Sequence, residues 1–176
     1  TDDDVNDMES VLENGVKQYS IKKLLDSQAN KDNILKKLDW LIQKSKEDYN
    51  SGKDTISIFY YSGHGTQRDT IDSEREGNEA NDECLLVFHQ GSLSDEDFVI
   101  RDDLLTDKIA EIKGKVFVIL DCCKGAGFEQ DFDFIKKGDS KVIIFSVFAE
   151  GQSAKEIPSL NQGLMTFCIL AGLSTD

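Results

Sequence analysis

Apolar residues recur at helical spacing in three parts of the chain. The first stripe predicts a helix that begins near the amino terminus and ends near Tyr19. The second predicts a helix that Asn30 or Asp32 can cap, and the third predicts a helix that opens with Asp102 and Asp103. The apolar positions that define the stripes are Val5, Met8, Leu12 and Val16; Ile34, Leu38, Leu41 and Ile42; and Leu104, Leu105, Ile109 and Ile112.

A β-branched and aromatic run occupies residues 55–61, an apolar run follows Lys115 up to residue 120, and a third run occupies residues 142–145. Runs of this length, rich in β-branched and aromatic residues, predict buried strands. A further short strand is expected at residues 84–88, whereas residues 68–83 are polar and acidic without periodicity and are expected to form a surface loop. Strands separated by helices predict an α/β fold, with a mostly parallel sheet that helices cover on both faces.

The length and composition of the chain suit one domain. Of its 176 residues 39% are hydrophobic, which is enough for one sizeable core, so residues 1–176 are expected to form a single domain. In mostly parallel sheets the working residues gather at the carboxyl ends of the strands. His64 follows the first apolar run and Cys123 follows the second, each in a turn that contains glycine.

The charge of the chain limits its partners. It has 34 acidic and 20 basic residues and a net charge of −14. This charge repels phosphate backbones and anionic lipids, so neither nucleic acid nor a membrane is an expected partner. Cationic partners, namely basic peptides and divalent metal ions, are favoured, although an acidic surface also serves solubility alone.

The cysteines indicate a reducing compartment. Cys84, Cys122, Cys123 and Cys168 form neither a Cys-x-x-Cys pair nor a zinc-ligand spacing. No apolar stretch has the length of a membrane span, and the chain does not open on a signal segment. We therefore expect a cytoplasmic protein.

His64 and Cys123 suit nucleophilic chemistry. A thiol becomes a nucleophile when a neighbouring base lowers its pKa, and a histidine can carry a proton to the leaving amine. Glycines beside each residue allow a substrate carbonyl to approach backbone N–H groups. A lone His or Cys after a strand more often has a packing role, so the prediction depends on finding both at strand ends.

Two segments resemble motifs of the metacaspases, cysteine peptidases of the caspase fold (clan CD). Residues 60–67 read Tyr-Tyr-Ser-Gly-His-Gly-Thr-Gln and are similar to the histidine motif of that family. Residues 120–127 read Leu-Asp-Cys-Cys-Lys-Gly-Ala-Gly and resemble its nucleophile motif. The two residues are 123 − 64 = 59 positions apart, in keeping with the caspase spacing of about 50. Weaker matches extend over nearly the whole chain, at residues 4–7, 33–41, 102–103, 151–154 and 163–166.

The resemblance implies a caspase-like three-layer sandwich and a cysteine endopeptidase that cleaves after Arg or Lys. It makes Cys123 the nucleophile and His64 its acid/base partner, with the backbone N–H groups of Gly65 and Cys123 as the oxyanion hole. Cys122 is then a packed small residue, or a partner of Cys123 in an inhibitory disulfide. Polypeptides with basic residues would be the substrates.

The resemblance also implies an acidic pocket and a metal site. Asp7, Ser62 and Asp121 would line the pocket for the basic side chain before the cleaved bond, because two carboxylates match a guanidinium or an ammonium group. A solvated place for Asp7 in a first helical turn is the alternative. The positions that match a calcium site, which would make Ca²⁺ an activator, are Asp82, Asp102 and Asp103. The alternative there is a pair of helix-capping residues beside a solvated loop.

Departures from the family pattern keep other functions open. Lys124 and Ala126 replace the usual His and Ser, and Asp4 stands where the family often has Cys. The family domain has a first strand and a carboxyl-terminal part that this chain is expected to lack. The alternatives are a pseudoprotease that serves as a binding module and a caspase-like effector subunit of a bacterial defence assembly. Self-processing is also expected, and its candidate sites are Lys124, Lys136, Lys137 and Lys141.

Overall fold

The computed structural model describes residues 2–15, 19–71, 81–92, 96–122, 141–146, 156–157 and 162–173.

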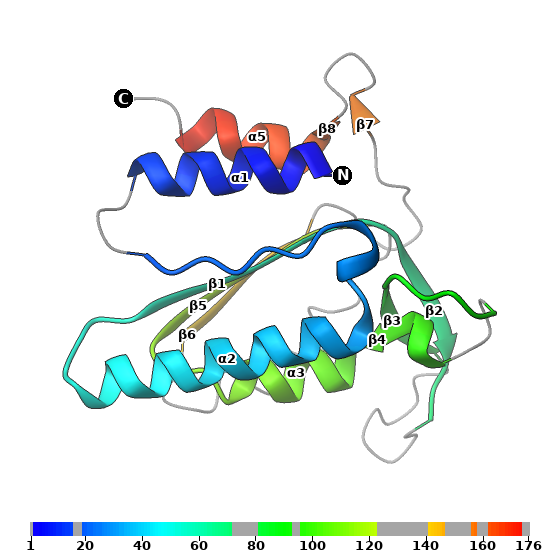
Figure 1. Cartoon of the computed structure of the whole chain (residues 1–176), viewed down its shortest axis with the longest axis horizontal. Helices are drawn as coiled ribbons and strands as arrows, with labels where there is room; N and C mark the ends of the chain where they lie inside the picture. The colour runs from blue at the N-terminus through cyan, green and yellow to red at the C-terminus, as the bar shows by residue number, and fades with distance from the viewer. Residues whose placement is uncertain are drawn as a thin grey trace.

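A parallel sheet of three strands forms the centre of the described structure (Figure 1). Its order is β1 (Ile56–Ser62), β5 (Lys115–Asp121) and β6 (Lys141–Ser146). The three strands coincide with the three apolar runs, so the prediction of a mostly parallel sheet is confirmed. The register matters for the site, because Ser62 at the end of β1 pairs with Asp121 at the end of β5.

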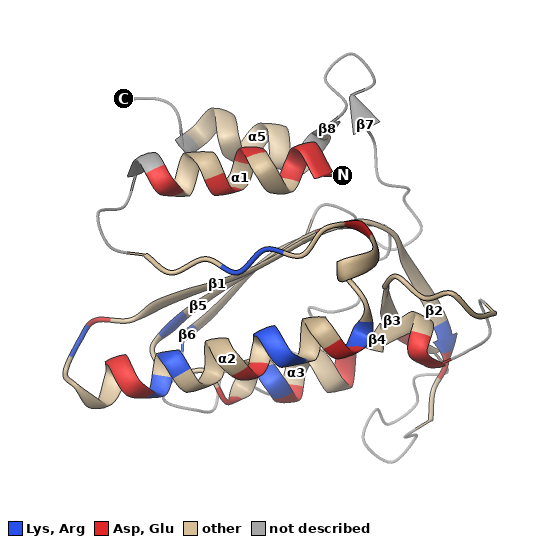
Figure 2. Cartoon of the chain, viewed as in Figure 1, with Lys and Arg blue, Asp and Glu red and all other residues tan. Residues whose placement is uncertain are grey.

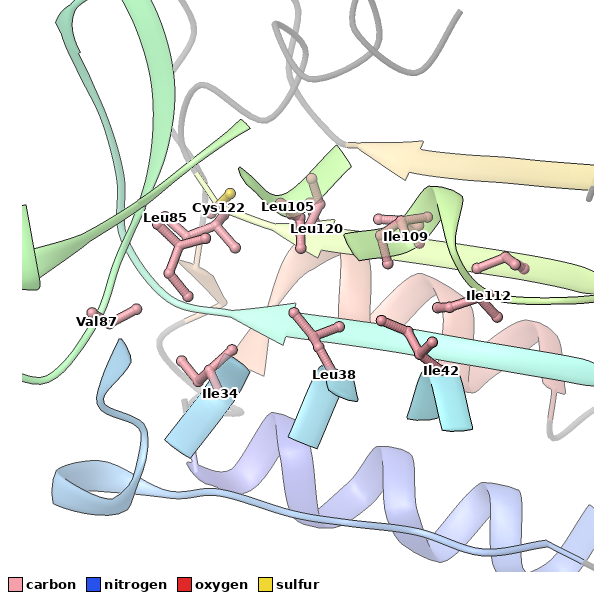
Figure 3. Packing of buried hydrophobic residues seen from close by; sticks show 13 residues of the cluster. Ile34, Leu38, Ile42, Leu85, Val87, Leu105, Ile109, Ile112, Leu120 and Cys122 are labelled. Atoms are coloured by element: carbon pink, nitrogen blue, oxygen red, sulfur yellow. The ribbon is translucent and has the colours of Figure 1, made fainter. Parts of the chain in front are cut away.

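Helices cover both faces of this sheet, which confirms the three-layer architecture (Figure 1). One face carries α2 (Lys31–Asn50) and α3 (Asp102–Ala110), and the other carries α1 (Asp2–Gly15) and α5 (Leu164–Leu173). The buried core lies between the sheet and the first pair of helices (Figure 3). Its members include Ile34, Leu38 and Ile42 of α2; Leu105 and Ile109 of α3; and Val116, Val118 and Leu120 of β5.

Local signals explain the bounds of α2. The Asn30 side chain accepts a hydrogen bond from the backbone N–H of Asn33 at 2.9 Å, so Asn30 is the cap and Asp32 lies in the first turn. The helix ends just before Gly52, whose φ of 81° is a left-handed conformation that glycine adopts without strain.

A second sheet corrects the prediction of a loop over residues 68–83. It is an antiparallel meander of β2 (Gly65–Asp69), β3 (Asn81–Leu86) and β4 (Val99–Arg101), and residues 72–80 lie outside the described part. The short segments beside these sheets are η1 (Asp26–Gln28), η2 (Glu96–Phe98), β7 (Glu156–Ile157) and β8 (Gln162–Gly163). The polar sequence of β2 shows no strand periodicity, because pairing with β3 rather than burial of an apolar face makes it a strand.

Within the described residues, every helix is too short or too polar to span a bilayer.

Candidate active site

The carboxyl ends of β1 and β5 lie side by side and carry the two predicted motifs. Beyond the Ser62–Asp121 pair, the backbone N–H of Gly63 donates to the carbonyl of Asp121 at 3.1 Å. His64 follows with an exposed side chain. On the other strand, Asp121 is followed by Cys122 and then by Cys123, which lies outside the described residues. The two motifs therefore leave neighbouring strands at the same edge of the sheet.

The backbone of His64 is fixed from two sides. Its carbonyl accepts the N–H of Leu86 at 2.9 Å, and the Tyr61 hydroxyl lies 2.8 Å from the same oxygen. The hydroxyl also lies 2.5 Å from the carbonyl oxygen of Leu86 and so bridges the two chain segments. A Cβ at Gly63 would come within 2.6 Å of this hydroxyl, so a larger residue there would displace the Tyr61 side chain.

The register also orients the N–H of Gly65, the predicted oxyanion donor. Gly65 pairs with Leu85, which places His64 opposite Leu86, and Leu86 donates to His64. In an antiparallel ladder, hydrogen-bonded pairs alternate with pairs that exchange no bond, so the Gly65 N–H points away from β3. The β2–β3 ladder therefore does not use this N–H, and its role as an oxyanion donor stays a prediction.

The described cysteines differ in their surroundings. The thiol of Cys122 is fully buried and packs with the core residues beneath the sheet (Figure 3). Cys84 is fully buried too, and burial raises the pKa of its thiol to about 12. Neither thiol lies at the surface, where a peptide would bind, whereas Cys168 is exposed on α5. Cys123, the predicted nucleophile, is outside the described residues.

A buried carboxylate of α1 contacts the end of β1. Asp4 is 1% exposed, and its Oδ2 accepts a hydrogen bond from the Ser62 hydroxyl at 2.7 Å. Its Oδ1 accepts the backbone N–H of Gly163 at 3.0 Å. Asp7, the residue expected in the pocket, is exposed one turn further along the helix. The structure thus brings Ser62 together with Asp4, which had been noted only as a departure from the family pattern.

A second buried carboxylate belongs to Asp121 itself. Its Oδ2 accepts two hydrogen bonds from Thr166, from the backbone N–H at 3.0 Å and from the hydroxyl at 2.7 Å. Since the Thr166 hydroxyl donates to Asp121, the Tyr60 hydroxyl donates to Thr166, at 2.6 Å. Burial raises the pKa of Tyr60 above its usual value, and the nearby Asp4 and Asp121 carboxylates add to the rise.

Gly163 separates the two carboxylates. Its N–H binds Asp4, and a Cβ at this position would clash with the Asp121 carboxylate. We call Asp4, Ser62, Asp121 and Thr166 the acidic cluster. Sequence reasoning missed Asp4, although a signal existed: Asp4 precedes the buried Met8 by four residues and so shares its helix face. Thr166 was noted only within the weaker family match at residues 163–166, because it approaches Asp121 only through the fold.

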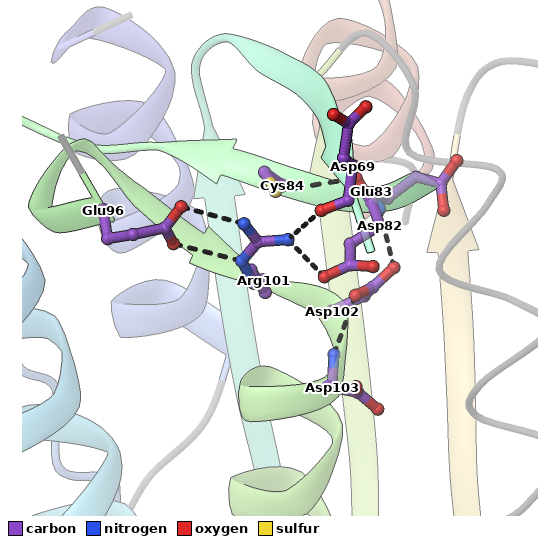
Figure 4. A network of polar contacts seen from close by, with 8 residues as sticks. All are labelled: Asp69, Asp82, Glu83, Cys84, Glu96, Arg101, Asp102 and Asp103. Carbon is purple, nitrogen blue, oxygen red and sulfur yellow. Dashed lines mark hydrogen bonds and ion pairs between the residues drawn. The ribbon is translucent and has the colours of Figure 1, made fainter. Parts of the chain in front are cut away.

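The three predicted calcium ligands lie around β3 and the start of α3 (Figure 4). Asp82 is 1% exposed and forms an ion pair with Arg101. Asp102 is equally buried, and its two oxygens accept the N–H groups of Glu83 at 2.7 Å and of Asp103 at 2.9 Å. Asp102 thus binds the backbone N–H of Glu83, the residue after Asp82, and the N–H of Asp103 in the first turn of α3.

This arrangement gives a calcium ion few ligands. Calcium takes six to eight oxygens, and the contacts of Asp82 and Asp102 already use three of their four carboxylate oxygens within the protein. The fourth, Oδ1 of Asp82, is buried without a hydrogen-bond partner, and the same holds for the Oδ1 atom of Asp103. In the described part of the chain, no three acidic, His or Cys side chains are grouped so that they could hold a metal ion. The printed contacts thus show how these residues are held within the protein, and calcium activation stays a prediction.

Acidic residues also surround the site more widely. Helix α1 carries six Asp or Glu residues and no Lys or Arg, and α5 carries no charged residue (Figure 2). Helix α2 on the opposite face has charges of both signs (Figure 2). The charged side chains of these two helices are therefore all acidic, and Lys23 of the segment after α1 pairs with one of them, Glu9. A surplus of negative charge attracts cationic ligands.

Comparison with known proteins agrees with the fold. The family model of the caspase domain matches residues 1–175, nearly the whole chain. Neither a search of curated proteins nor a search of solved structures gave a significant match.

Proposed function

Because the chain belongs to the caspase domain family, we propose that it is a cysteine endopeptidase that cleaves after Arg or Lys. In this proposal Cys123 is the nucleophile and His64 is the acid/base group. The pair of buried carboxylates, Asp4 and Asp121, carries the proposal, because it lies at the strand ends that lead into these two residues. The metacaspase-like motifs agree with it.

The proposed reaction follows the acyl-transfer route of thiol enzymes. His64 takes the proton of the Cys123 thiol, and the thiolate attacks the carbonyl carbon of the substrate. The N–H groups of Gly65 and Cys123 would stabilise the resulting oxyanion. His64 then gives its proton to the leaving amine as the peptide bond breaks. Water hydrolyses the thioester, which releases the acid and restores the thiol.

The acidic cluster supports the choice of a basic side chain. Two carboxylates match the guanidinium of Arg or the ammonium of Lys, and a substrate aspartate would add a third negative charge. Among the described residues, the arginines are Arg68 and Arg101, and Arg101 is committed to Asp82 and Glu96. A caspase-like preference for Asp would need arginines at the substrate, so the cluster argues against it.

A panel of fluorogenic peptides that end in Arg, Lys or Asp tests the proposal. We expect cleavage after Arg and Lys to exceed cleavage after Asp by about 10²-fold, the scale of a mismatched charge that costs several kcal/mol. Assays with Ca²⁺ and with a chelator test the calcium prediction at the same time. Efficient cleavage after Asp would refute the basic specificity.

Two cysteine variants serve as matched controls in this panel. Cys123→Ala should abolish cleavage, whereas Cys122→Ala should leave most of it, because the Cys122 thiol lies in the core beneath the sheet. Circular dichroism checks that both variants are folded. Equal loss in both folded variants would contradict the assignment of Cys123. If the wild-type chain cleaves no peptide at all, the binding-module alternative gains support.

A further inference from the structure

Arg101 is a nearly buried cation among acidic groups (Figure 4). It ends β4 and is 8% exposed. Its guanidinium donates two hydrogen bonds to the carboxylate of Glu96, at 3.1 and 2.8 Å. It also donates to the backbone carbonyl of Asp69 at 3.0 Å and forms an ion pair with the carboxylate of Asp82. A planar fork with five donors suits this number of acceptors, and an ammonium group could not reproduce it.

These contacts join three segments that are distant in sequence. Asp69 ends β2, Asp82 lies at the start of β3, and Glu96 begins η2. The Asp82 and Glu96 carboxylates share the positive charge of Arg101. Hydrogen bonds from Arg101 keep the pKa of Glu96 below its usual value, and the nearby charges of Lys31 and Arg68 act in the same direction. Removing the charge of Arg101 would leave the buried Asp82 carboxylate without its counter-ion, which is costly in a protein interior.

The same strands hold the backbone of His64. β2 begins at Gly65, directly after His64, and β3 ends at Leu86, which donates to the His64 carbonyl. Arg101 fastens the opposite end of this strand pair, where Asp69 pairs with Asn81. The β2–β3 pair therefore connects the contacts of Arg101 at one end to the turn that contains His64 at the other end.

We propose that Arg101 is the resident cation of this acidic region and positions His64 through the β2–β3 pair, so that ordering of this region needs no bound calcium. A calcium ion would compete with Arg101 for Asp82 and with backbone N–H groups for Asp102. The role of resident cation follows from these contacts alone. The positioning of His64 rests in addition on the proposed peptidase function.

Arg101→Gln removes the charge and is the variant that tests the proposal. We expect a lower melting temperature and, well below it, a kcat for Arg peptides that is reduced about tenfold, the scale on which distant packing changes shift activity. KM should stay within about twofold, because the acidic cluster that would bind the substrate is made by other elements. Arg101→Lys keeps the charge without the fork and should restore part of kcat.

Lys108→Gln is the matched control. It removes one positive charge from the neighbouring helix α3, where Lys108 pairs with Asp39 at the surface. We expect its kcat and KM to equal those of the wild type. If Lys108→Gln lowers kcat as much as Arg101→Gln does, loss of charge in general explains the effect and the proposal fails.

Calcium supplies the second readout, which does not depend on activity. The melting temperature of the wild-type chain should be the same with CaCl₂ and with a chelator. A clear rise in the wild-type melting temperature with CaCl₂ would overturn the proposal. If the wild-type chain has no peptidase activity, the proposed function fails, but the melting temperatures of wild type and variants still test Arg101 as the resident cation.

Glu96→Gln keeps the test decisive if Arg101→Gln does not fold. The Glu96 side chain is 56% exposed, so this change weakens its ion pair with Arg101 without leaving a buried carboxylate unpaired. It should lower kcat in the same direction but by less. A folded Glu96→Gln variant with unchanged kcat and an unchanged melting temperature would overturn the proposal.

Discussion

Asp4 and Asp7 lie one turn apart on α1 in opposite surroundings. Asp4 is buried and oriented by Ser62 and Gly163, whereas Asp7 is exposed. A carboxylate that is shielded from water and held by hydrogen bonds interacts more strongly with a bound cation than a solvated one does. The position of Asp4 therefore suggests that it, and not Asp7, contributes charge to the recognition of a basic side chain.

We predict that Asp4→Asn raises KM for Arg peptides about tenfold, equivalent to ~1.4 kcal/mol, and that Asp7→Asn changes it by less than about twofold. Asn retains one oxygen, which can accept either the Ser62 hydroxyl or the Gly163 N–H, so the charge is removed with little change of shape and with the loss of one hydrogen bond. Steady-state kinetics on peptides with Arg or its uncharged analogue citrulline before the cleaved bond measure the effect. The increase should vanish for citrulline.

A larger effect of Asp7→Asn would mean that Asp7, the residue implied by the family resemblance, binds the basic side chain of the substrate. Equal effects of both changes on Arg and citrulline peptides would show that neither carboxylate pairs with the substrate charge.

At the level of single residues, the sequence predicted what depends on local motif and missed what depends on distant partners. His64 follows its strand as expected, because an apolar run ending in Gly63 defines both the strand and the turn. Asp82 was placed in an exposed acidic loop but is buried, because Arg101 pairs with it from 19 positions away. Periodicity within a segment contains no information about such a partner.

Lys141, one of the candidate sites of self-processing, lies in strand β6. Lys141 begins β6, its N–H donates to Gly114 at 3.2 Å, and it pairs with Lys115 of β5 in the parallel ladder. Peptidases bind their substrates as extended, accessible segments, so a bond within a sheet must first leave its ladder. The other candidates, Lys124, Lys136 and Lys137, lie outside the described residues.

We predict that Lys141→Gln leaves the pattern of self-cleavage unchanged, because the Lys141–Val142 bond lies in the ladder of β6. Intact-mass analysis of the purified chain after incubation measures the fragments, and Cys123→Ala shows which of them arise from self-cleavage. A fragment that ends at Lys141 in the wild type and is absent from Lys141→Gln would contradict the prediction. It would mean that β6 separates from β5 before cleavage.

At the level of elements, the sequence predicted the central sheet and its helices but not the second sheet. The runs that became β1, β5 and β6 are apolar because helices cover the sheet on both faces. The sequence of β2, Gly-Thr-Gln-Arg-Asp, has no apolar alternation, and four of its five residues are only half-buried. Its strand conformation depends on hydrogen bonds to β3, which lies beyond a separate stretch of chain.

The charge of the whole molecule is distributed unevenly around the site. The net charge is −14, and all charged side chains of α1, which provides Asp4, are acidic (Figure 2). A field of one sign raises the rate at which oppositely charged ligands associate, by ~10-fold or more at low salt. Salt shortens its range from about 30 Å at 0.01 M to about 3 Å at 1 M, so the effect is measurable.

We predict that a peptide with Arg at the cleaved bond and further Lys residues in its flanks loses kcat/KM steeply as NaCl rises. A peptide with the same Arg and neutral flanks should lose much less, because short contacts within the acidic cluster are screened less than long-range attraction is. The two salt slopes, measured on the same enzyme preparation, separate attraction by the whole molecule from recognition in the pocket.

Charge reversals on the two helix layers locate the origin of this attraction. Asp3→Lys lies on the acidic helix α1, and Glu47→Lys lies near the end of α2 on the opposite face of the sheet. Both substitutions change the net charge by the same amount. If the attraction originates near α1, Asp3→Lys should lower the kcat/KM of the cationic peptide at low salt more than Glu47→Lys does. Equal reductions would mean that only net charge acts. Equal salt slopes for the two peptides would mean that the preference for basic substrates arises within the acidic cluster alone.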